Sequence, residues 1–472
     1  MNRYRALRSS LLALLLAATT PAAAEKPLTL DEVLASVKST YPPYLAALIE
    51  MDIANGRVRQ AAGAFDLNLS AGGSFTPSGY YDGRSGAALL EQPLPFWGGS
   101  LFGGYQLSSG FLPNYNKDRT QRDGEAILGF KLNLLRDGTL DRRRAQLYQA
   151  RVDQELADPL ILRQYIDFIR AASIAYYNWL AAGHRWQLAE ELLRVAKDRD
   201  EAIAEQAGRG AVAPIICVDN ERLVVSRQIS VVQARRRFEA AAIELSLFHR
   251  GEDDEPVISP RSRLLSAFPE PPVPDATRLS SDIAKALIFR PEIRRLDLTL
   301  EKADIERRLA KNNLLPNLDL TLQANQAVSE RTQKDMERLE MEAKIQFSLP
   351  LQRNEAKGRL ETIEAQMSRL QTERQFARDR ISADVRDAMS AVQAARQQIT
   401  QTRRNVELAT QIEQAEALKF QQGAADLLAL QIREQATFDA RQLDVEAHAE
   451  YLRALANHRA AIATDAPASL AR

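Results

Sequence analysis

The sequence predicts a mainly α-helical protein with a membrane β-barrel portion, both built on a duplicated helix–strand–strand–helix repeat. Long helices are predicted because residues 359–466 contain no proline and a single glycine, Gly423. Glycine and proline are the strongest breaks in a chain, so this stretch predicts a long helix, a turn and a shorter returning helix. Strands are predicted because apolar and polar residues alternate in several short segments. The duplication is predicted because the same order of elements occurs twice.

The helix before Gly423 carries a heptad seam of the kind found in coiled coils. Its apolar and small residues recur at alternating steps of three and four: Val385, Ala388, Val392, Ala395, Ile399, Thr402, Val406 and Ala409. A helix of about 65 residues rises roughly 100 Å, which is more than a compact core needs. In the first half, residues 136–207 predict a matching helix with a kink or restart at Pro159. The apolar face of that helix comprises Ile166, Ile169, Tyr176 and Leu180.

Two-residue alternation, the signal of a strand with one apolar face, is clear in four segments. These segments cover residues 65–76, 126–134, 317–324 and 341–349. Glycine and aromatic residues are dense between them in the first half, where residues 101–107 predict a strand and residues 87–92 are a further candidate. The expected count is about four strands per chain, each close to the length of roughly nine to eleven residues that a tilted transmembrane strand needs.

The predicted boundaries divide the chain into five parts. Residues 1–24 predict a signal peptide, because arginines precede a short apolar run and small residues precede the expected cleavage site. The other parts are a first repeat at 25–250, a Pro-rich linker at 251–278, a second repeat at 279–463 and a short tail at 464–472. Barrel strands are expected at about 65–135 and 316–351, and the tips of the helical hairpins near 208–211 and 422–426. Gly210 and Gly423 lie nearly as far apart as Phe130 and Phe347, which favours an internal duplication.

The composition argues against several classes of function. The chain has 62 basic and 62 acidic residues, so it lacks the basic excess that usually accompanies nucleic-acid binding. Its four histidines lie on helical patterns without ligand partners, and it contains neither a phosphate-binding glycine loop nor a nucleophile elbow. We therefore predict no enzyme activity, no catalytic residue, no metal site and no cofactor. The single cysteine, Cys217, rules out an intramolecular disulfide and is expected to be buried.

The strands themselves point to an oligomer. Each strand has one uninterrupted apolar face, as a strand in contact with lipid would have. About four strands from one chain cannot close a wide barrel, and an open sheet edge leaves backbone groups unpaired in hydrocarbon at a cost of several kcal/mol each. Several copies are therefore expected to contribute strands to one shared barrel. The alternative is an α+β protein whose hairpins pack on its own helices.

Several motifs resemble the TolC-like bacterial outer-membrane efflux protein family. Residues 419–428 resemble the periplasmic tip of that family: a basic residue, an aromatic residue, a glycine four positions after the basic residue and a small polar residue three positions later. The matching stretch of the first half covers residues 206–222. Residues 314–320 resemble the start of a barrel strand and residues 347–351 the end of one. The order of these motifs and their twofold recurrence extend the resemblance over nearly the whole mature chain.

The resemblance implies a homotrimer with a twelve-stranded β-barrel in the lipid of the outer membrane and a long α-helical tunnel in the periplasm. It implies the outer-membrane channel of a tripartite efflux or type I secretion system. Such a channel is a passive conduit that opens when a periplasmic adaptor docks, with an inner-membrane pump supplying the energy. The adaptor would dock on the hairpin tips, at Arg209, Gly210, Lys419, Gly423 and Asp426. The alternative function is a periplasmic coiled-coil scaffold or adaptor-like protein without a pore.

The tip residues also have a physical rationale. Gly423 can adopt the positive φ that ends many helices, and Asp426 can cap the returning helix. Lys419 lies near the C-terminus of the preceding helix, where the helix dipole favours positive charge. The sequence departs from some relatives because Ala429 and Ile432 stand where acidic residues narrow the tunnel entrance, so an acidic gate is not expected there.

Overall fold

The computed structural model describes residues 26–112, 119–210, 212–251, 253–270, 272–273, 275–328, 339–465 and 467. The predicted signal peptide and most of the predicted tail lie outside these residues. The chain divides into two compact units. The tip unit comprises Met1–Tyr41, Ala172–Pro272 and Ala395–Arg453, and the sheet unit comprises Pro42–Ala171, Val273–Ala394 and Ala454–Arg472.

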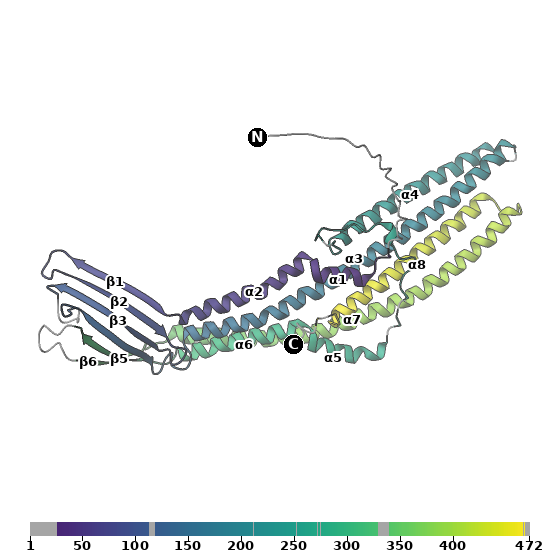
Figure 1. Ribbon diagram of the computed structural model, residues 1–472. Helices are drawn as coiled ribbons and strands as arrows, with labels where there is room; N and C mark the ends of the chain where they lie inside the picture. Colours follow the sequence, from purple (N-terminus) through teal and green to yellow (C-terminus); the bar gives the residue numbers. More distant parts are fainter. Residues whose placement is uncertain are drawn as a thin grey trace, which may run out of the picture. The chain divides into compact units, whose positions relative to one another are not determined.

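Eight α-helices occur among the described residues (Figure 1). They are α1 (Leu30–Thr40), α2 (Pro42–Ala62), α3 (Arg142–Gly208), α4 (Pro214–Ser246), α5 (Leu279–Phe289), α6 (Pro291–Asn312), α7 (Asn354–Gln421) and α8 (Leu427–Ala461). In each half, a single residue separates the first short helix from the second, which begins with a proline, Pro42 or Pro291. Proline suits the first helical position, where its missing N–H has no helical partner to lose.

The restart predicted at Pro159 is wrong, because α3 runs through this residue as one helix of 67 residues. Proline removes one helical hydrogen bond and crowds the preceding turn. Ala157 and Ile161, on either side of Pro159, are both buried. Burying these apolar side chains offsets part of the cost of the proline.

The heptad seam of α7 is confirmed over its first five positions. The side chains of Val385, Ala388, Val392, Ala395 and Ile399 are buried, and the later seam positions are half-buried. The apolar face predicted for the first long helix is also buried. Within the described residues, no helix contains an apolar run long enough to cross a bilayer.

One antiparallel sheet forms the β portion of the sheet unit. Its strands are β1 (Asn68–Thr76), β2 (Gly83–Pro93), β3 (Ser100–Gly110), β4 (Glu125–Asn133), β5 (Asn317–Ala327) and β6 (Glu340–Ser348). They lie side by side in sequence order, so β1 and β6 are the two edges. The expected count of about four strands is wrong, because the first half contributes four strands and the second half two.

The helices of the sheet unit pack through two apolar clusters. In the first, Leu140, Ala145 and Val152, at the start of α3, contact Leu298 and Ile305 of α6. In the second, apolar residues of α5 and α6 meet α7 and the end of α8: Ala286, Ile293, Ile381, Val385 and Ala461. The sheet lies at one end of this helical packing in the unit (Figure 1).

The tip unit has its own core around the middle of α3. The largest fully buried side chains there include Tyr176, Trp179, Leu180, Leu245 and Tyr451. Part of the predicted Pro-rich linker also packs on this core. The ring of Phe268 lies 4.8 Å from the ring of His184 and 5.6 Å from that of His448, measured between centroids.

Candidate functional site

The turn between α7 and α8 has the geometry predicted for a helix-ending glycine. Gly423 has a φ of 74°, and its N–H donates to the carbonyl of Phe420 at 3.0 Å. The N–H of Ala424 donates to the carbonyl of Lys419 at 2.8 Å. This pair of bonds is the Schellman motif, which satisfies the last carbonyls of a helix.

Asp426 caps the returning helix α8, as predicted. Its carboxylate accepts a hydrogen bond from the N–H of Ala429 at 2.7 Å, at the third position of the helix. This bond satisfies one of the four N–H groups that a helix start leaves unpaired, and the negative charge suits the helix N-terminus. The local sequence around Gly423 therefore fixes the turn.

The turn between α3 and α4 repeats the glycine but not the cap. Gly210 has a φ of 72°, and its N–H donates to the carbonyl of Ala207 at 2.9 Å. Ala213 precedes α4 and provides no side-chain cap. Pro214 starts α4 without a donor, which reduces the number of unpaired N–H groups by one.

The five residues predicted for the tips all belong to the tip unit, and both turns lie at the same end of that unit (Figure 1). The two basic side chains pair with a carboxylate on their own helix. Arg209 lies 3.6 Å from Glu205, and Lys419 lies 3.4 Å from Glu416. Both basic side chains are more than half exposed, and such pairs contribute about 1 kcal/mol or less, so both basic groups stay available to a partner.

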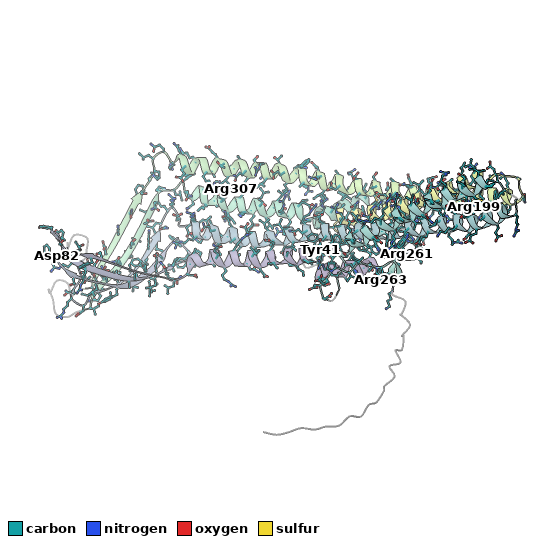
Figure 2. The ribbon with its side chains drawn as sticks, turned by 90° about the horizontal axis from the view of Figure 1, so that it is seen from above. Tyr41, Asp82, Arg199, Arg261, Arg263 and Arg307 are labelled. Carbon is teal, nitrogen blue, oxygen red and sulfur yellow. The ribbon has the colours of Figure 1, made fainter. Side chains whose placement is uncertain are left out.

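A buried ionic cluster, formed by Arg199, Arg227 and Glu434, links the two hairpins within the tip unit (Figure 2 labels Arg199). Arg199 of α3 and Arg227 of α4 each bind one oxygen of the Glu434 carboxylate on α8. Arg227 also donates to the carbonyl of Leu192 at 3.0 Å. Burial lowers the pKa of Arg227, and the contact with Glu434 opposes that shift. The cluster joins α3, α4 and α8 by charge as well as by packing.

Sequence reasoning missed this cluster, because a glutamate on a helix is usually solvated. Glu434 instead lies on a buried stripe with Leu430, Thr437 and Ala440, spaced by steps of four, three and three. A charge at a seam position was the available signal. The half-buried Cys217 is a second difference, since it was expected to be buried.

The six strands present one continuous apolar face. The paired registers place the following large apolar residues on it: Leu69, Phe75, Leu90, Leu101, Tyr105, Leu107, Leu128, Phe130, Leu132, Leu318, Leu320, Leu322, Met341, Ile345 and Phe347. Polar side chains on this face lie near the strand ends, at Arg84, Gln92, Ser109 and Gln326. The opposite face carries hydrogen-bonded polar pairs such as Ser74 with Ser85 and Gln106 with Glu125. An apolar band on one face and polar pairs on the other are typical of a transmembrane β-barrel wall.

Aromatic residues lie at both ends of this band. At the loop end, the ring of Tyr81 lies 4.8 Å from that of Tyr80 and 5.4 Å from that of Phe111. At the helix end, Phe96 and Trp97 are exposed in the turn between β2 and β3. Membrane barrels carry aromatic girdles at both lipid–water interfaces, and these two groups have that placement.

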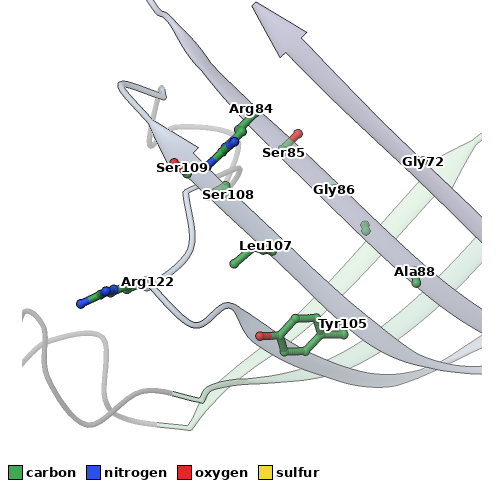
Figure 3. A pocket seen from close by; sticks show the side chains of 11 residues that line it. Gly72, Arg84, Ser85, Gly86, Ala88, Tyr105, Leu107, Ser108, Ser109 and Arg122 are labelled. Atoms are coloured by element: carbon green, nitrogen blue, oxygen red, sulfur yellow. The ribbon is translucent and has the colours of Figure 1, made fainter.

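A pocket of about 850 Å³ lies on strands β1 to β3 (Figure 3). Its lining includes Tyr105 and two arginines, Arg84 of β2 and Arg122 of the loop between β3 and β4. None of the described residues that line it is a carboxylate, a histidine or a cysteine, so it offers no acid–base pair. Elsewhere in the described part of the chain, no group of three or more metal-binding side chains occurs.

Comparison with known proteins finds a family model that is similar to part of the chain. Residues 283–464 match the model of the outer membrane efflux protein family. The match covers α6, β5, β6, α7 and α8, which include the tip motif around Gly423. This match confirms the predicted resemblance to TolC-like efflux proteins. A similarity to efflux proteins also supports the prediction that the chain is not an enzyme.

Solved structures extend the likeness to the whole chain at the level of fold. A membrane protein from Pseudomonas aeruginosa is 14% identical, with 92% of this chain and 90% of that chain covered and a TM-score of 0.68. The MtrE outer membrane channel of Neisseria gonorrhoeae is 14% identical, with 92% and 88% covered and a TM-score of 0.66. The outer-membrane channel OprN is 15% identical, with 92% and 89% covered and a TM-score of 0.65. The predicted fold class is thereby confirmed. No curated protein matches the chain.

Proposed function

We propose that this protein is the outer-membrane channel of a tripartite efflux or type I secretion system, and that it works as a homotrimer. The observation that carries the proposal is the sheet, which exposes one continuous apolar face over six strands and polar pairs on the other. A single open sheet of this kind exposes an apolar face to water and leaves unpaired backbone groups along its two edges. In a barrel shared between copies, lipid contacts the apolar face and the polar face lines a water-filled interior. The edges of neighbouring copies pair with each other.

Planar-bilayer recording tests this function. The purified full-length chain should insert and give discrete conductance steps, and it should sediment as a trimer after detergent extraction. The competing function, a periplasmic coiled-coil scaffold without a pore, is favoured only by the long helices. Recovery of the protein in the soluble periplasmic fraction, with no conductance, would support that scaffold and exclude a channel.

The hairpin tips are the proposed docking surface for a periplasmic adaptor, through Arg209, Gly210, Lys419, Gly423 and Asp426. The proposal rests on their exposure and on the position of both turns at one end of the tip unit. Substituting Asp426→Asn keeps the helix cap, because asparagine caps about as well as aspartate, but it removes the charge. The wild-type chain should cross-link to its adaptor in cells.

Reduced cross-linking of the Asp426→Asn variant, with unchanged protein level, would assign the carboxylate to docking. A second variant, Asp439→Asn, removes a charge farther along α8, where Asp439 accepts a hydrogen bond from Gln435. This variant should cross-link like the wild type. Equal cross-linking by all three proteins would exclude a docking role for the Asp426 charge.

A further inference from the structure

We infer that the shared barrel has eighteen strands, with β1 of each copy paired to β6 of the next, and that the hairpin β1–β2 widens it beyond the twelve strands implied by the resemblance. This inference rests on the proposed trimeric channel and deepens it. Each chain brings six strands in one sheet, so three copies bring eighteen. The two edges of the sheet are the surfaces that meet, and the partner is a second copy of this chain.

The directions of the strands allow this closure. Every neighbouring pair in the sheet is antiparallel, and the number of strands is even, so β1 and β6 run in opposite directions. Rotation of a second copy about the barrel axis keeps the direction of each strand along that axis. The β6 edge of one copy therefore meets the β1 edge of the next as an antiparallel pair, and the ladder continues around the ring.

The two edges also match in length and in pattern. Both β1 and β6 are nine residues long, and every residue of both strands is exposed. Leu69 and Phe75 of β1 are 67% and 73% exposed, and Met341 and Phe347 of β6 are 80% and 62% exposed. These four residues lie on the same apolar face of the sheet, so pairing the edges extends the apolar band without a break.

The β1 edge lacks the devices that keep natural edge strands from pairing. Exposed edges are usually protected by charged side chains, prolines or bulges. The nine residues of β1 contain no charged residue and no proline, and all nine pair with β2 in a continuous register. Such an edge is suited to a permanent partner strand.

The hairpin β1–β2 is the part of the sheet that has no counterpart in the second half. There, one hairpin, β5–β6, stands between helices α6 and α7. In the first half, the turn between β2 and β3 lies at the helix end of the sheet. There the side-chain amide of Asn133 donates to the carbonyl of Gly98 at 3.3 Å, and the backbone N–H of Asn133 donates to the carbonyl of Trp97. Strand β3 therefore starts at the same end as β1, and removal of β1–β2 leaves the direction of β3 unchanged.

The added strands change what the barrel can pass. The diameter of a barrel grows roughly linearly with strand number, so eighteen strands give a barrel about 1.5 times as wide as twelve. Barrels of about sixteen to eighteen strands leave an aqueous channel when no plug fills them. The membrane portion of this channel is thus suited to bulkier polar cargo than a twelve-stranded barrel.

Cross-linking tests the pairing of the edges. In a Cys217→Ser background, Ser70→Cys on β1 is combined with Lys344→Cys, Gln346→Cys or Ser348→Cys on β6. Three β6 positions are used because the experiment also determines which β6 residue lies opposite Ser70 of the neighbouring copy. At least one pair should give a ladder of two and three linked chains without reductant. The matched control combines Ser70→Cys with Thr321→Cys, which lies inside the sheet on β5, and should give no ladder.

Electron microscopy of the purified full-length trimer tests the strand count, which should be eighteen. Deletion of residues 68–99 should leave a membrane-inserted trimer with twelve strands and a correspondingly narrower barrel. A conducting trimer whose barrel has twelve strands, or whose cysteine variants give no β1–β6 cross-link, would overturn this inference and leave the proposed channel intact. A monomer that gives no conductance would overturn both.

Discussion

Arg227 of α4 donates a hydrogen bond to Glu434 of α8 at 3.3 Å between Nη2 and Oε2, and the two side chains are only 4% and 6% exposed. Arg199 binds the second oxygen of the same carboxylate. Removing one partner of a buried ion pair costs about 3–5 kcal/mol, because the remaining charge loses its compensation. We therefore expect Glu434→Ala to weaken the packing of α8 on α3 and α4 by a similar amount. Amide hydrogen exchange across residues 427–440 should become markedly faster.

The control for this experiment is Glu407→Ala. Glu407 pairs with Arg404 at 2.9 Å on the exposed face of α7, where an ion pair contributes about 1 kcal/mol or less. Exchange in this variant should stay close to that of the wild type. If both variants exchanged alike, the buried cluster would not be what holds the two hairpins together.

A glycine-to-alanine comparison tests the backbone requirement at the second tip. A Cβ at position 423 would contact nothing within 4 Å, so the cost of Gly423→Ala comes from its φ of 74° alone. A left-handed conformation costs a residue other than glycine about 1–2 kcal/mol. Faster exchange of the amides of residues 423 and 424, which donate the two bonds of the turn, should report this loss.

Gly208→Ala is the matched substitution at the end of α3. This position is equally open, and Gly208 is helical, so alanine should be neutral or stabilising by up to about 1 kcal/mol. If the positive φ of Gly423 is the cause, Gly423→Ala should lower stability and Gly208→Ala should not. This explanation would be abandoned if both variants lost stability to the same extent.

The missing cap at the first tip gives a stabilising prediction. Ala213 occupies the position before α4 that Asp426 occupies before α8, and only the aspartate accepts a hydrogen bond from the helix with its side chain. The N–H of Ile216 already donates to the carbonyl of Ala213 at 3.0 Å. We expect Ala213→Asp to stabilise the start of α4 by about 0.5–2 kcal/mol, since its carboxylate can accept from the N–H of Ile215. The exchange of that amide should slow several-fold. Ala213→Leu, which offers no acceptor, should bring no such protection.

The tips could be predicted from sequence because their interactions are local. The Schellman bonds and the Asp426 cap join residues at most five positions apart. The buried cluster could not be predicted in the same way, because Glu434 and its arginine partners are more than 200 positions apart in the chain. Only the packing of the two hairpins brings these charges together.

The strands show where the alternation signal is strong and where it fails. In β6, large apolar residues alternate with charged or amide residues, and the strand was predicted close to its observed bounds. In β2, Ala87 and Leu89 lie on the opposite face from Ala88 and Leu90, so apolar residues fall on both faces and the period of two is blurred. A blurred period predicts too few strands, and the six observed strands are the basis for the wider barrel.

The stability of the tip unit should fall in mild acid because of His184. This side chain is buried, and its Nδ1 lies 3.1 Å from the amide oxygen of Gln187. Burial lowers the pKa of His184; the Gln187 contact opposes this shift, and His448 adds to it. Below its ordinary pKa of about 6.5, the unfolded chain binds a proton that the folded chain does not. Stability then decreases as the pH falls, with a slope of up to about 1.4 kcal/mol per pH unit from this group.

The variant His184→Gln removes this titration and should flatten the pH dependence of the midpoint of thermal unfolding between about pH 7.5 and 5.5, the range that brackets the ordinary histidine pKa. The control is His458→Gln in the sheet unit, where burial also lowers the histidine pKa but Asp282 opposes the shift from 3.7 Å away. Hydrogen exchange read separately in each unit distinguishes the two histidines, because each substitution should change the acid sensitivity of its own unit. Parallel pH profiles for wild type and His184→Gln in the tip unit would show that folding leaves the pKa of this imidazole unchanged, contrary to its burial.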